Sequence, residues 1–591
     1  MTNAVAVYRH TLKLCWRVSP LVTVLNVVLI LLMSGAAALT AVSQRKLIDG
    51  AQTGVISAVV VAAGLGVLAH VGTFILGRVQ GESNQDLVVR VAREIDLEVL
   101  AMAASIPTLG HLERPDFLDR VTNLRRDGIF LVRSVWSGVA MVGALIGLAF
   151  SAWLLVGIHP ALPLLAAFAV PLLLLISLGD RHRQRVRDRT AESHRHERDL
   201  HQLCMEPEPA KELRIAGTGP ELSRRADRLW AETTDVMVRS RLYAMVLEAA
   251  GWVLMFAALG GALLLVLDLK DAGRATVGDV VLLITLTTTL NMQIERLVRG
   301  FTTMNDGGNV IGHYVWLTNY GTGQTAGTAP APANLTRGIS LHGVGFAYPG
   351  TGDPVLTDVD LDLPAGRTVA LVGLNGAGKT TLVKLLTGMY RPDTGRILVD
   401  DVPLADIDPR QWARCGAGVF QDFARLQLLV RENVGVGDLD RLDDPAAVRG
   451  GVERAGAGPV VDGLPDGLQT QLGTLFQGAD LSFGQWQKLA LARGVMRRRP
   501  LLLVLDEPTS ALDPQAEHEL FVRFTEQARE AAAAQGAVTV IVSHRFSTVK
   551  MADLIVVVES GRILEQGSHA ALLATGGRYA SLYRAQAESY S

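Results

Sequence analysis

The chain has 591 residues, of which 49% are hydrophobic and 19% charged, and its mean hydropathy is +0.27. A soluble protein of this size normally carries about a quarter charged residues, so the composition indicates a membrane protein. The net charge of −2, from 56 basic and 58 acidic residues, excludes a polybasic nucleic-acid-binding protein and an acidic disordered chain. The three cysteines are far apart and fit no disulfide framework or cysteine metal site.

Long uncharged stretches characterise the N-terminal half. Val18–Gln44 and Gly50–Gly77 contain no Asp, Glu, Lys or Arg, and each is long enough to cross a bilayer, which takes about 20 apolar residues in a helix. The uncharged stretch Ser134–Gly179 is interrupted by Pro160 and Pro163, so it predicts two helices joined by a tight turn. We predict six membrane spans, at residues 20–42, 55–78, 134–158, 161–179, 247–267 and 278–298.

Charged residues near two of the predicted spans depart from the simple pattern. The uncharged part of the sixth span, Val280–Ile294, is short, so we expect Asp279 or Glu295 to lie near an interface or to face a wet cavity. Arg45 and Lys46 fall in the first outer loop and oppose the tendency of basic residues to remain in the cytoplasm.

Basic residues set the expected orientation in the membrane. Residues 180–243 carry 13 arginines and Lys211, and an arginine at the bilayer centre costs about 2.5–3.5 kcal/mol. We therefore expect a multi-pass protein of the cell (cytoplasmic) membrane, with the N-terminus, residues 78–133 and 180–245 and everything after Arg296 inside. The two internal segments have helical charge patterns, which predicts long cytoplasmic extensions of the membrane helices.

The composition changes after residue 319. Residues 321–333 have no charge and no large apolar side chain, which is typical of a linker. Short β-like runs then alternate with helical ones, which predicts an α/β domain with a parallel sheet. We therefore predict a multi-domain protein, with an all-α six-helix transmembrane domain at 1–318, a linker at 319–334 and an α/β P-loop nucleotide-binding domain at 335–591.

A phosphate-binding motif follows the predicted strand Thr368–Val372. The sequence Gly373-Leu-Asn-Gly-Ala-Gly-Lys-Thr380 matches G-x-x-x-x-G-K-[ST] between a strand and a helix. Its glycines let backbone N–H groups approach phosphates, Lys379 neutralises phosphate charge, and Thr380 offers a hydroxyl to Mg²⁺. The predicted nucleotide-binding residues of this motif are Gly373, Asn375, Gly376, Ala377, Gly378, Lys379, Thr380 and Thr381.

A second acidic element completes the predicted hydrolytic site. The apolar strand Leu501–Leu505 ends in Asp506 and Glu507. Asp506 is placed to hold Mg²⁺ through water, and Glu507 is placed to take a proton from an attacking water molecule. The cofactors predicted for this site are ATP and Mg²⁺.

Further motifs resemble the ATP-binding cassette (ABC) family. Leu481-Ser-Phe-Gly-Gln485 looks like the family's signature motif, and Gln487–Arg493 extends the match. Asp506–Asp513 resembles its magnesium strand and D-loop. The order and spacing agree from Tyr348 to His544, and six spans before one cassette resemble exporter-type half-transporters (type IV fold, B-family-like).

The resemblance implies roles for individual residues. Gln421 would sense the γ-phosphate and Mg²⁺, Glu507 would polarise water, His544 would hold the γ-phosphate, and Tyr348 would stack on adenine. It also implies nucleotide contacts for Val355, Ser482, Gly484, Gln485 and Asp513, and metal ligation by Thr380, Gln421 and Asp506.

The implied function is that of a transport ATPase. By resemblance the chain is an ATP-hydrolysing exporter half-transporter, which moves a peptide, a lipid-like molecule or an amphipathic small molecule out of the cytoplasm by alternating access. Each ATP would lie between the Walker loop of one copy and the signature motif of another, and residues 106–120 and 208–219 would form coupling helices. The alternative is an ATP-gated channel or regulatory subunit of the same fold.

Two departures from the family pattern bear on the partner. Phe483 stands where the signature usually has a glycine-type residue, and it would cost about 1 kcal/mol or more if the backbone required φ > 0. Residues Gln471–Gly478 lack the glutamate that exporters usually carry before the signature. A homodimer is favoured, and an asymmetric heterodimer with a related half-transporter remains the alternative.

Overall fold

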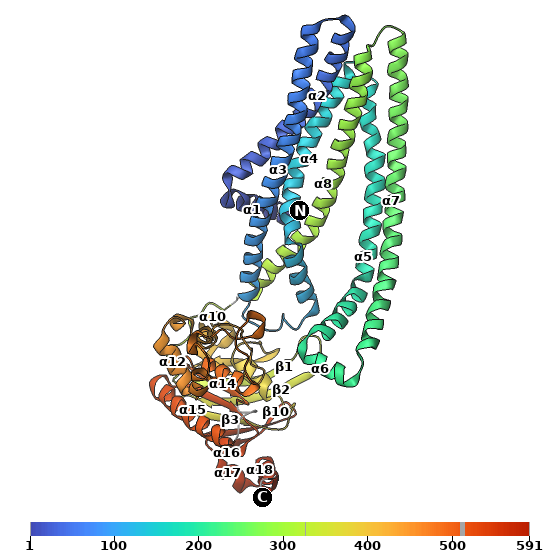
Figure 1. Ribbon diagram of the computed structural model, residues 1–591. Coiled ribbons are helices and arrows are strands. Elements are labelled where there is room, and N and C mark those ends of the chain that lie inside the picture. The colour runs from blue at the N-terminus through green and yellow to red at the C-terminus, as the bar shows by residue number, and fades with distance from the viewer. Residues whose placement is uncertain (1, 325–326, 509–513, 590–591) are drawn as a thin grey trace. The chain divides into compact units, whose positions relative to one another are not determined.

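The computed structural model describes residues 2–324, 327–508 and 514–589 (Figure 1). The chain divides into two compact units, each considered by itself. The first comprises Met1–Leu100 and Val121–Trp316, and the second comprises Ala101–Arg120 and Leu317–Ser591.

The first unit is entirely helical in its described part, and six of its helices are long and apolar enough to cross a membrane. The predicted six-helix, all-α architecture is confirmed. Prolines and glycines mark the helix ends: Pro20 occupies the first turn of α2, and Gly54 ends it with φ 73°. The elements are α1 (Thr2–Val18), α2 (Pro20–Thr53), α3 (Ile56–Ala104), α4 (Pro115–Val156), a 3₁₀ turn (Leu162–Phe168), α5 (Ala169–Met205), α6 (Pro207–Ala216), α7 (Gly219–Asp271) and α8 (Val277–Gln324).

Helices α5 and α7 run side by side along most of their length (Figure 1). Gly251 on α7 permits a close approach, because a Cβ there would lie 2.6 Å from Cδ1 of Leu172 on α5. A Cβ at Gly179 of α5 would likewise lie 3.0 Å from Cβ of Ala244 on α7. Small residues at these crossings replace the bulky side chains that keep most helices 8–10 Å apart.

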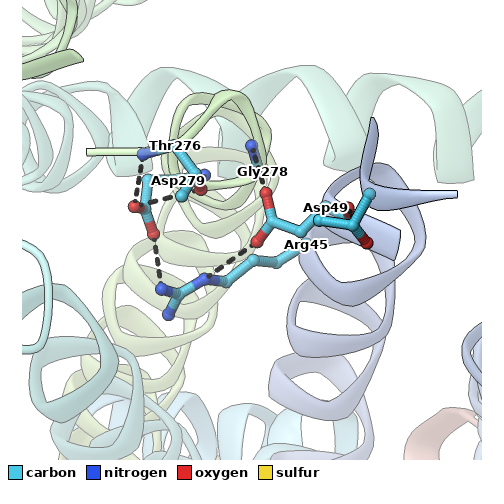
Figure 2. A network of polar contacts seen from close by, with 6 residues as sticks. Arg45, Asp49, Thr276, Gly278 and Asp279 are labelled. Carbon is cyan, nitrogen blue, oxygen red and sulfur yellow. Dashed lines mark hydrogen bonds and ion pairs between the residues drawn. The ribbon is translucent and has the colours of Figure 1, made fainter. Parts of the chain in front are cut away.

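A polar network joins the ends of α2 and α8 (Figure 2). Nη2 of Arg45 lies 2.9 Å from Oδ1 of Asp279, whose side chain is only 7% exposed. Asp49 accepts a hydrogen bond from the backbone N–H of Gly278 at 3.1 Å, and Asp279 accepts one from that of Thr276 at 2.9 Å. Arg45, which opposed the charge rule, and Asp279, which needed a partner or water, therefore neutralise each other.

The second unit contains two sheets. Its antiparallel sheet has the order β2-β1-β4-β5, and its main sheet has the order β10-β9-β3-β8-β7-β6, parallel except for β10. The predicted parallel α/β sheet is confirmed. The strands are β1 (Gly338–Ala347), β2 (Pro354–Pro364), β3 (Thr368–Val372), β4 (Thr394–Val399), β5 (Val402–Pro403), β6 (Gly416–Val419), β7 (Leu502–Asp506), β8 (Val538–Val542), β9 (Leu554–Glu559) and β10 (Arg562–Gly567).

Helices cover these sheets and form a separate subdomain. One hydrophobic cluster lies beneath both sheets and α9, while a second gathers α11, α12, α14 and part of α15. The Walker loop therefore belongs to one cluster and the signature motif to the other. The helices are α9 (Lys379–Leu386), α10 (Pro409–Cys415), α11 (Val430–Gly435), α12 (Pro445–Arg454), α13 (Gly458–Asp462), α14 (Phe483–Gly494), α15 (Pro514–Gln535), α16 (Phe546–Val549), α17 (His569–Thr575) and α18 (Arg578–Ser589).

The expected linker pairs with the second unit instead of standing free. Helix α8 continues to Gln324, and Ala329 then forms a parallel bridge with Ile407. The N–H of Ala329 donates to Asp406 O at 2.8 Å, and that of Leu335 donates to Gln535 O at 2.8 Å. Small side chains cannot build a core, but their backbone groups still pair with a neighbouring chain.

Residues 101–120 belong to the same unit as the cassette. Helix α3 ends at Ala104, residues 105–114 form turns, and α4 begins at Pro115. The N–H of Leu109 donates to Met389 O at 2.8 Å, and the hydroxyl of Tyr390 donates to a carboxylate oxygen of Glu113. Residues 208–219, the other predicted coupling segment, contain most of helix α6.

Candidate ATP-binding and hydrolysis site

The phosphate-binding loop connects the buried strand β3 to helix α9. Gly378 precedes the helix with φ 104°, and a Cβ there would lie 2.7 Å from Cδ2 of Leu356 and 3.3 Å from Val355 O. Both the backbone conformation and the available space therefore require glycine. Val355, a predicted nucleotide contact, lies directly against this loop.

Lys379 folds back over the loop that precedes it. Its Nζ donates to Gly373 O at 2.8 Å and to Leu374 O at 2.9 Å, and the residue is only 6% exposed. Burial lowers the pKa of Lys379, while the carboxylates of Glu507 and Asp506 oppose that shift. Loop residues 374–376, which include Asn375 and Gly376, are exposed, and Ala377 is buried. The loop thus presents its tip to solvent with a cation held beneath it.

Asp506, at the end of the buried strand β7, meets Thr380 from the Walker loop. Asp506 is 2% exposed, and within the described residues its Oδ1 has no hydrogen-bond partner. Burial raises its pKa, a hydrogen bond with Thr380 lowers it, and the charges of Glu507 and Asp422 raise it further. A buried carboxylate oxygen without a partner, next to a hydroxyl, fits a cation with oxygen ligands.

This donor set fits Mg²⁺ better than a metal held by protein alone. Across 2–324, 327–508 and 514–589, no group of three or more His, Cys, Asp or Glu side chains could enclose a metal ion. Mg²⁺ is commonly bound through one or two carboxylates, with water and substrate phosphates filling its octahedron. Asp506 and Thr380 are the side chains that could provide such a partial set.

Glu507 and His544 lie together although 37 positions separate them in the chain. Parallel pairing of β7 with β8 places Asp506 opposite Val542, so the residues that follow both strands emerge at one edge. Nε2 of His544 is 2.5 Å from Oε1 of Glu507. Glu507 has φ 47° and donates its N–H to Val542 O at 3.0 Å. A non-glycine residue with positive φ is uncommon and is often found at functional sites.

Tyr348 is placed beside the first turn of α9. Its hydroxyl lies 3.0 Å from Oγ1 of Thr381, another predicted nucleotide contact. Its ring meets Tyr390 edge-on with centroids 5.5 Å apart, and Nζ of Lys384 lies 5.4 Å from its centroid. Tyr390 and Lys384 were not predicted from the sequence. Lys384 is five residues after Lys379 on the same predicted helix, which was the available signal.

The signature residues begin helix α14. Ser482 is the N-cap, and it forms a capping box with Gln485, whose Oε1 accepts the N–H of Ser482 at 2.8 Å. Phe483 is the first helical residue and is not among the described residues with positive φ. The backbone cost expected for Phe483 therefore does not arise. Gly484 follows in the first turn, where a Cβ would have nothing within 4 Å.

Some of the predicted site is not assembled within one chain. Gln421 lies after strand β6, with an exposed side chain, and the signature helix lies on the second hydrophobic cluster, apart from the Walker loop. Asp513 lies outside the described residues. Gln487, which the family resemblance included without a role, is buried, and its Nε2 donates to Pro508 O at 2.9 Å, directly after Glu507.

Comparisons with known proteins agree with this geometry. The family model described as "ABC transporter" matches residues 356–510. An "ATP-dependent lipid A-core flippase" of Chromobacterium violaceum is 44% identical over 262 residues, 44% of this chain and 42% of that protein. One of Aromatoleum aromaticum is 36% identical over 326 residues, 55% of this chain and 52% of that protein. The chain thus spans about half or less of these curated relatives.

A solved structure, described as "Structure of a bacterial Atm1-family ABC exporter with ATP bound", has the same fold. It aligns with a TM-score of 0.76 and 22% identity over 95% of this chain and 98% of that chain. Residues 356–510 therefore match the ABC transporter family, and the chain as a whole shares the fold of this exporter structure, with six membrane-capable helices followed by one ATP-binding domain.

Proposed function

We propose that the chain is an ATP-hydrolysing exporter half-transporter that moves a lipid-like substrate out of the cytoplasm. The observation that carries the proposal is the Glu507–His544 pair at the edge of the sheet, next to Lys379 and Asp506. A structural ion pair would not require Glu507 to adopt a positive φ. The lipid-like substrate is suggested by the flippase relatives, and peptide or amphipathic cargo remains the other possibility.

Each residue of the site would have its own role in ATP binding and hydrolysis. Lys379 and the loop N–H groups would bind the β- and γ-phosphates, and Tyr348 would pack against the base. Glu507 would orient the attacking water and accept its proton, while His544 would hold Glu507 and the γ-phosphate in place. Mg²⁺, bound by Asp506 and Thr380 with Gln421 nearby, would neutralise charge that develops on the phosphates.

A second copy is needed to complete this site. Ser482 and Gly484 provide N–H groups at the start of α14, an anion-binding position, but they lie on a different cluster from the Walker loop. A head-to-tail dimer with two-fold symmetry would close two equivalent ATP sites. Because Phe483 fits a helical backbone without strain, its presence does not disfavour a homodimer, which we propose as the functional form.

Residues 101–120 provide a path from ATP to the membrane domain. Tyr348 touches Tyr390, and Tyr390 hydrogen-bonds Glu113 in the turn that precedes α4. A change at the nucleotide would therefore reach the start of a membrane helix through two aromatic side chains. We propose residues 106–120 and 208–219 as the segments that transmit the ATPase cycle to the helices.

The test is ATP hydrolysis and transport by the full chain. Glu507→Gln in lipid nanodiscs should lower kcat about 10²–10⁴-fold, the usual contribution of a general base, and should retain ATP binding. ATP-dependent uphill uptake into inside-out vesicles would support export. An unchanged ATPase rate in the variant would refute the catalytic role of Glu507. Opening on ATP binding without uphill transport would refute the exporter and favour the channel alternative.

A further inference from the structure

The signature helix α14 is attached to both segments that carry predicted catalytic residues. Nη2 of Arg493, near its C-terminal end, donates to Ala424 O at 3.1 Å. The buried Gln487 donates to Pro508 O at 2.9 Å, one residue after Glu507. The helix therefore holds the backbone that follows strand β6 and the backbone that follows strand β7.

A third attachment is made by side chains at the N-terminal end of α14. We name it the aromatic clasp: Phe423, Arg425 and Phe483. The rings of Phe423 and Phe483 are tilted by 46° with centroids 5.3 Å apart, and Cζ of Arg425 lies 5.6 Å from the Phe483 centroid. These values fall within the usual ranges for aromatic pairs, about 4.5–7 Å, and for cation–π contacts, within about 6 Å.

Burial alone does not explain an aromatic residue at position 483. Phe483 is 46% exposed, and the resemblance to the signature motif led us to expect a small residue there. Phe423 is partly buried and packs against the second hydrophobic cluster. Phe483 contacts Phe423, which is two positions after Gln421. Phe483 therefore extends the packing of that cluster to the N-terminus of the signature helix.

We propose that Phe483 is a positioning residue that acts on Gln421 through Phe423. The clasp and the Arg493–Ala424 bond secure residues 421–425 near opposite ends of α14, so the segment cannot pivot when the helix moves. With a small residue at 483, the ring contacts with Phe423 and Arg425 would be lost, and the Arg493 bond near the other end of α14 would hold the segment less firmly. The inference rests on the proposed ATPase function and deepens it, because it links the signature helix to Gln421 within one chain.

The experiment is a double-mutant cycle in the full-length protein in nanodiscs, with Phe483→Ala, Phe423→Ala and the double variant. Each single change should lower kcat about threefold to tenfold, with the KM for ATP changed by less than about twofold, since an aromatic pair is worth that factor. The double variant should be no slower than the slower single variant, and Phe483→Tyr should restore the rate. Val522→Ala, equally exposed at 46%, is the control and should hydrolyse ATP normally.

The apparent melting temperature of the same variants gives a readout that needs no turnover. Coupling between Phe423 and Phe483 in melting should match their coupling in kcat. Additive losses in both measurements, or a rate loss confined to Phe483→Ala, would overturn the clasp. A wild-type chain that does not hydrolyse ATP would instead refute the proposed function, and the melting cycle would still decide whether the clasp exists.

Discussion

Replacing Arg45 with alanine should destabilise the membrane unit, because it leaves the carboxylate of Asp279 buried. Breaking a fully buried ion pair by removing one partner costs about 3–5 kcal/mol. The side chain of Asp279 is 7% exposed but that of Arg45 is 37% exposed, so water can partly replace the guanidinium. We therefore expect a loss of about 1–3 kcal/mol, between the values for exposed and buried pairs.

The assay is the apparent melting temperature of the full chain in detergent, compared among Arg45→Ala, Asp279→Asn and the double variant. Arg45→Ala should lower it by a few degrees, roughly 2–4 °C per kcal/mol. The double variant should recover part of the loss, because the buried side chain at position 279 is then neutral. Lys46→Ala is the matched control, since Lys46 is an exposed neighbour on the same helix. Losses that simply add in the double variant would show that Arg45 and Asp279 do not stabilise each other.

Two further predictions concern the second unit. Burial raises the pKa of Asp400, but the N–H groups of Gly338, Thr336 and Arg337 outweigh it and leave the pKa below its usual value. The stabilisation is therefore present above about pH 4 and is lost as the pH falls through the lowered pKa. Asp400→Asn should cost about 1–2 kcal/mol at pH 7, and its difference in melting temperature from the wild type should shrink as the pH falls below about 4; a pH-independent difference would contradict this. Tyr390→Phe removes the hydroxyl that binds Glu113, so it should lower substrate stimulation of the ATPase more than the basal rate, measured in the same nanodiscs; equal losses would exclude this route of coupling.

Local patterns predicted the elements well, because both helices and strands depend on residues close in sequence. The Walker loop was predicted from one continuous motif, and the structure places Gly378 of that motif where no Cβ fits. The proximity of Glu507 to His544 required knowledge of strand order, which only the β7–β8 pairing supplies. The sequence could therefore identify Glu507 and His544 as candidate site residues but could not predict their contact.

Other features depended on tertiary contacts that leave no local signal. The charge of Asp279 indicated a need for compensation, but its partner lies 234 positions earlier in the chain. For Phe483, the family pattern suggested a backbone penalty, whereas the residue lies at the start of a helix with ordinary geometry. The linker has no core-forming side chains, as its composition indicated. The backbone of Ala329 nevertheless pairs with residues 406–408.

Because residues 101–120 belong to the same compact unit as the cassette, this unit is discontinuous in the sequence. A fragment beginning at residue 335 would lack the turn that covers Met389 and Tyr390, and would expose a cavity of about 460 Å³ whose wall includes Pro107 and Thr108. An excised cassette should accordingly be less stable than the same domain in the intact protein. Evolutionary exchange of cassettes between transporters would have to preserve this short turn, although it is encoded more than 200 codons upstream.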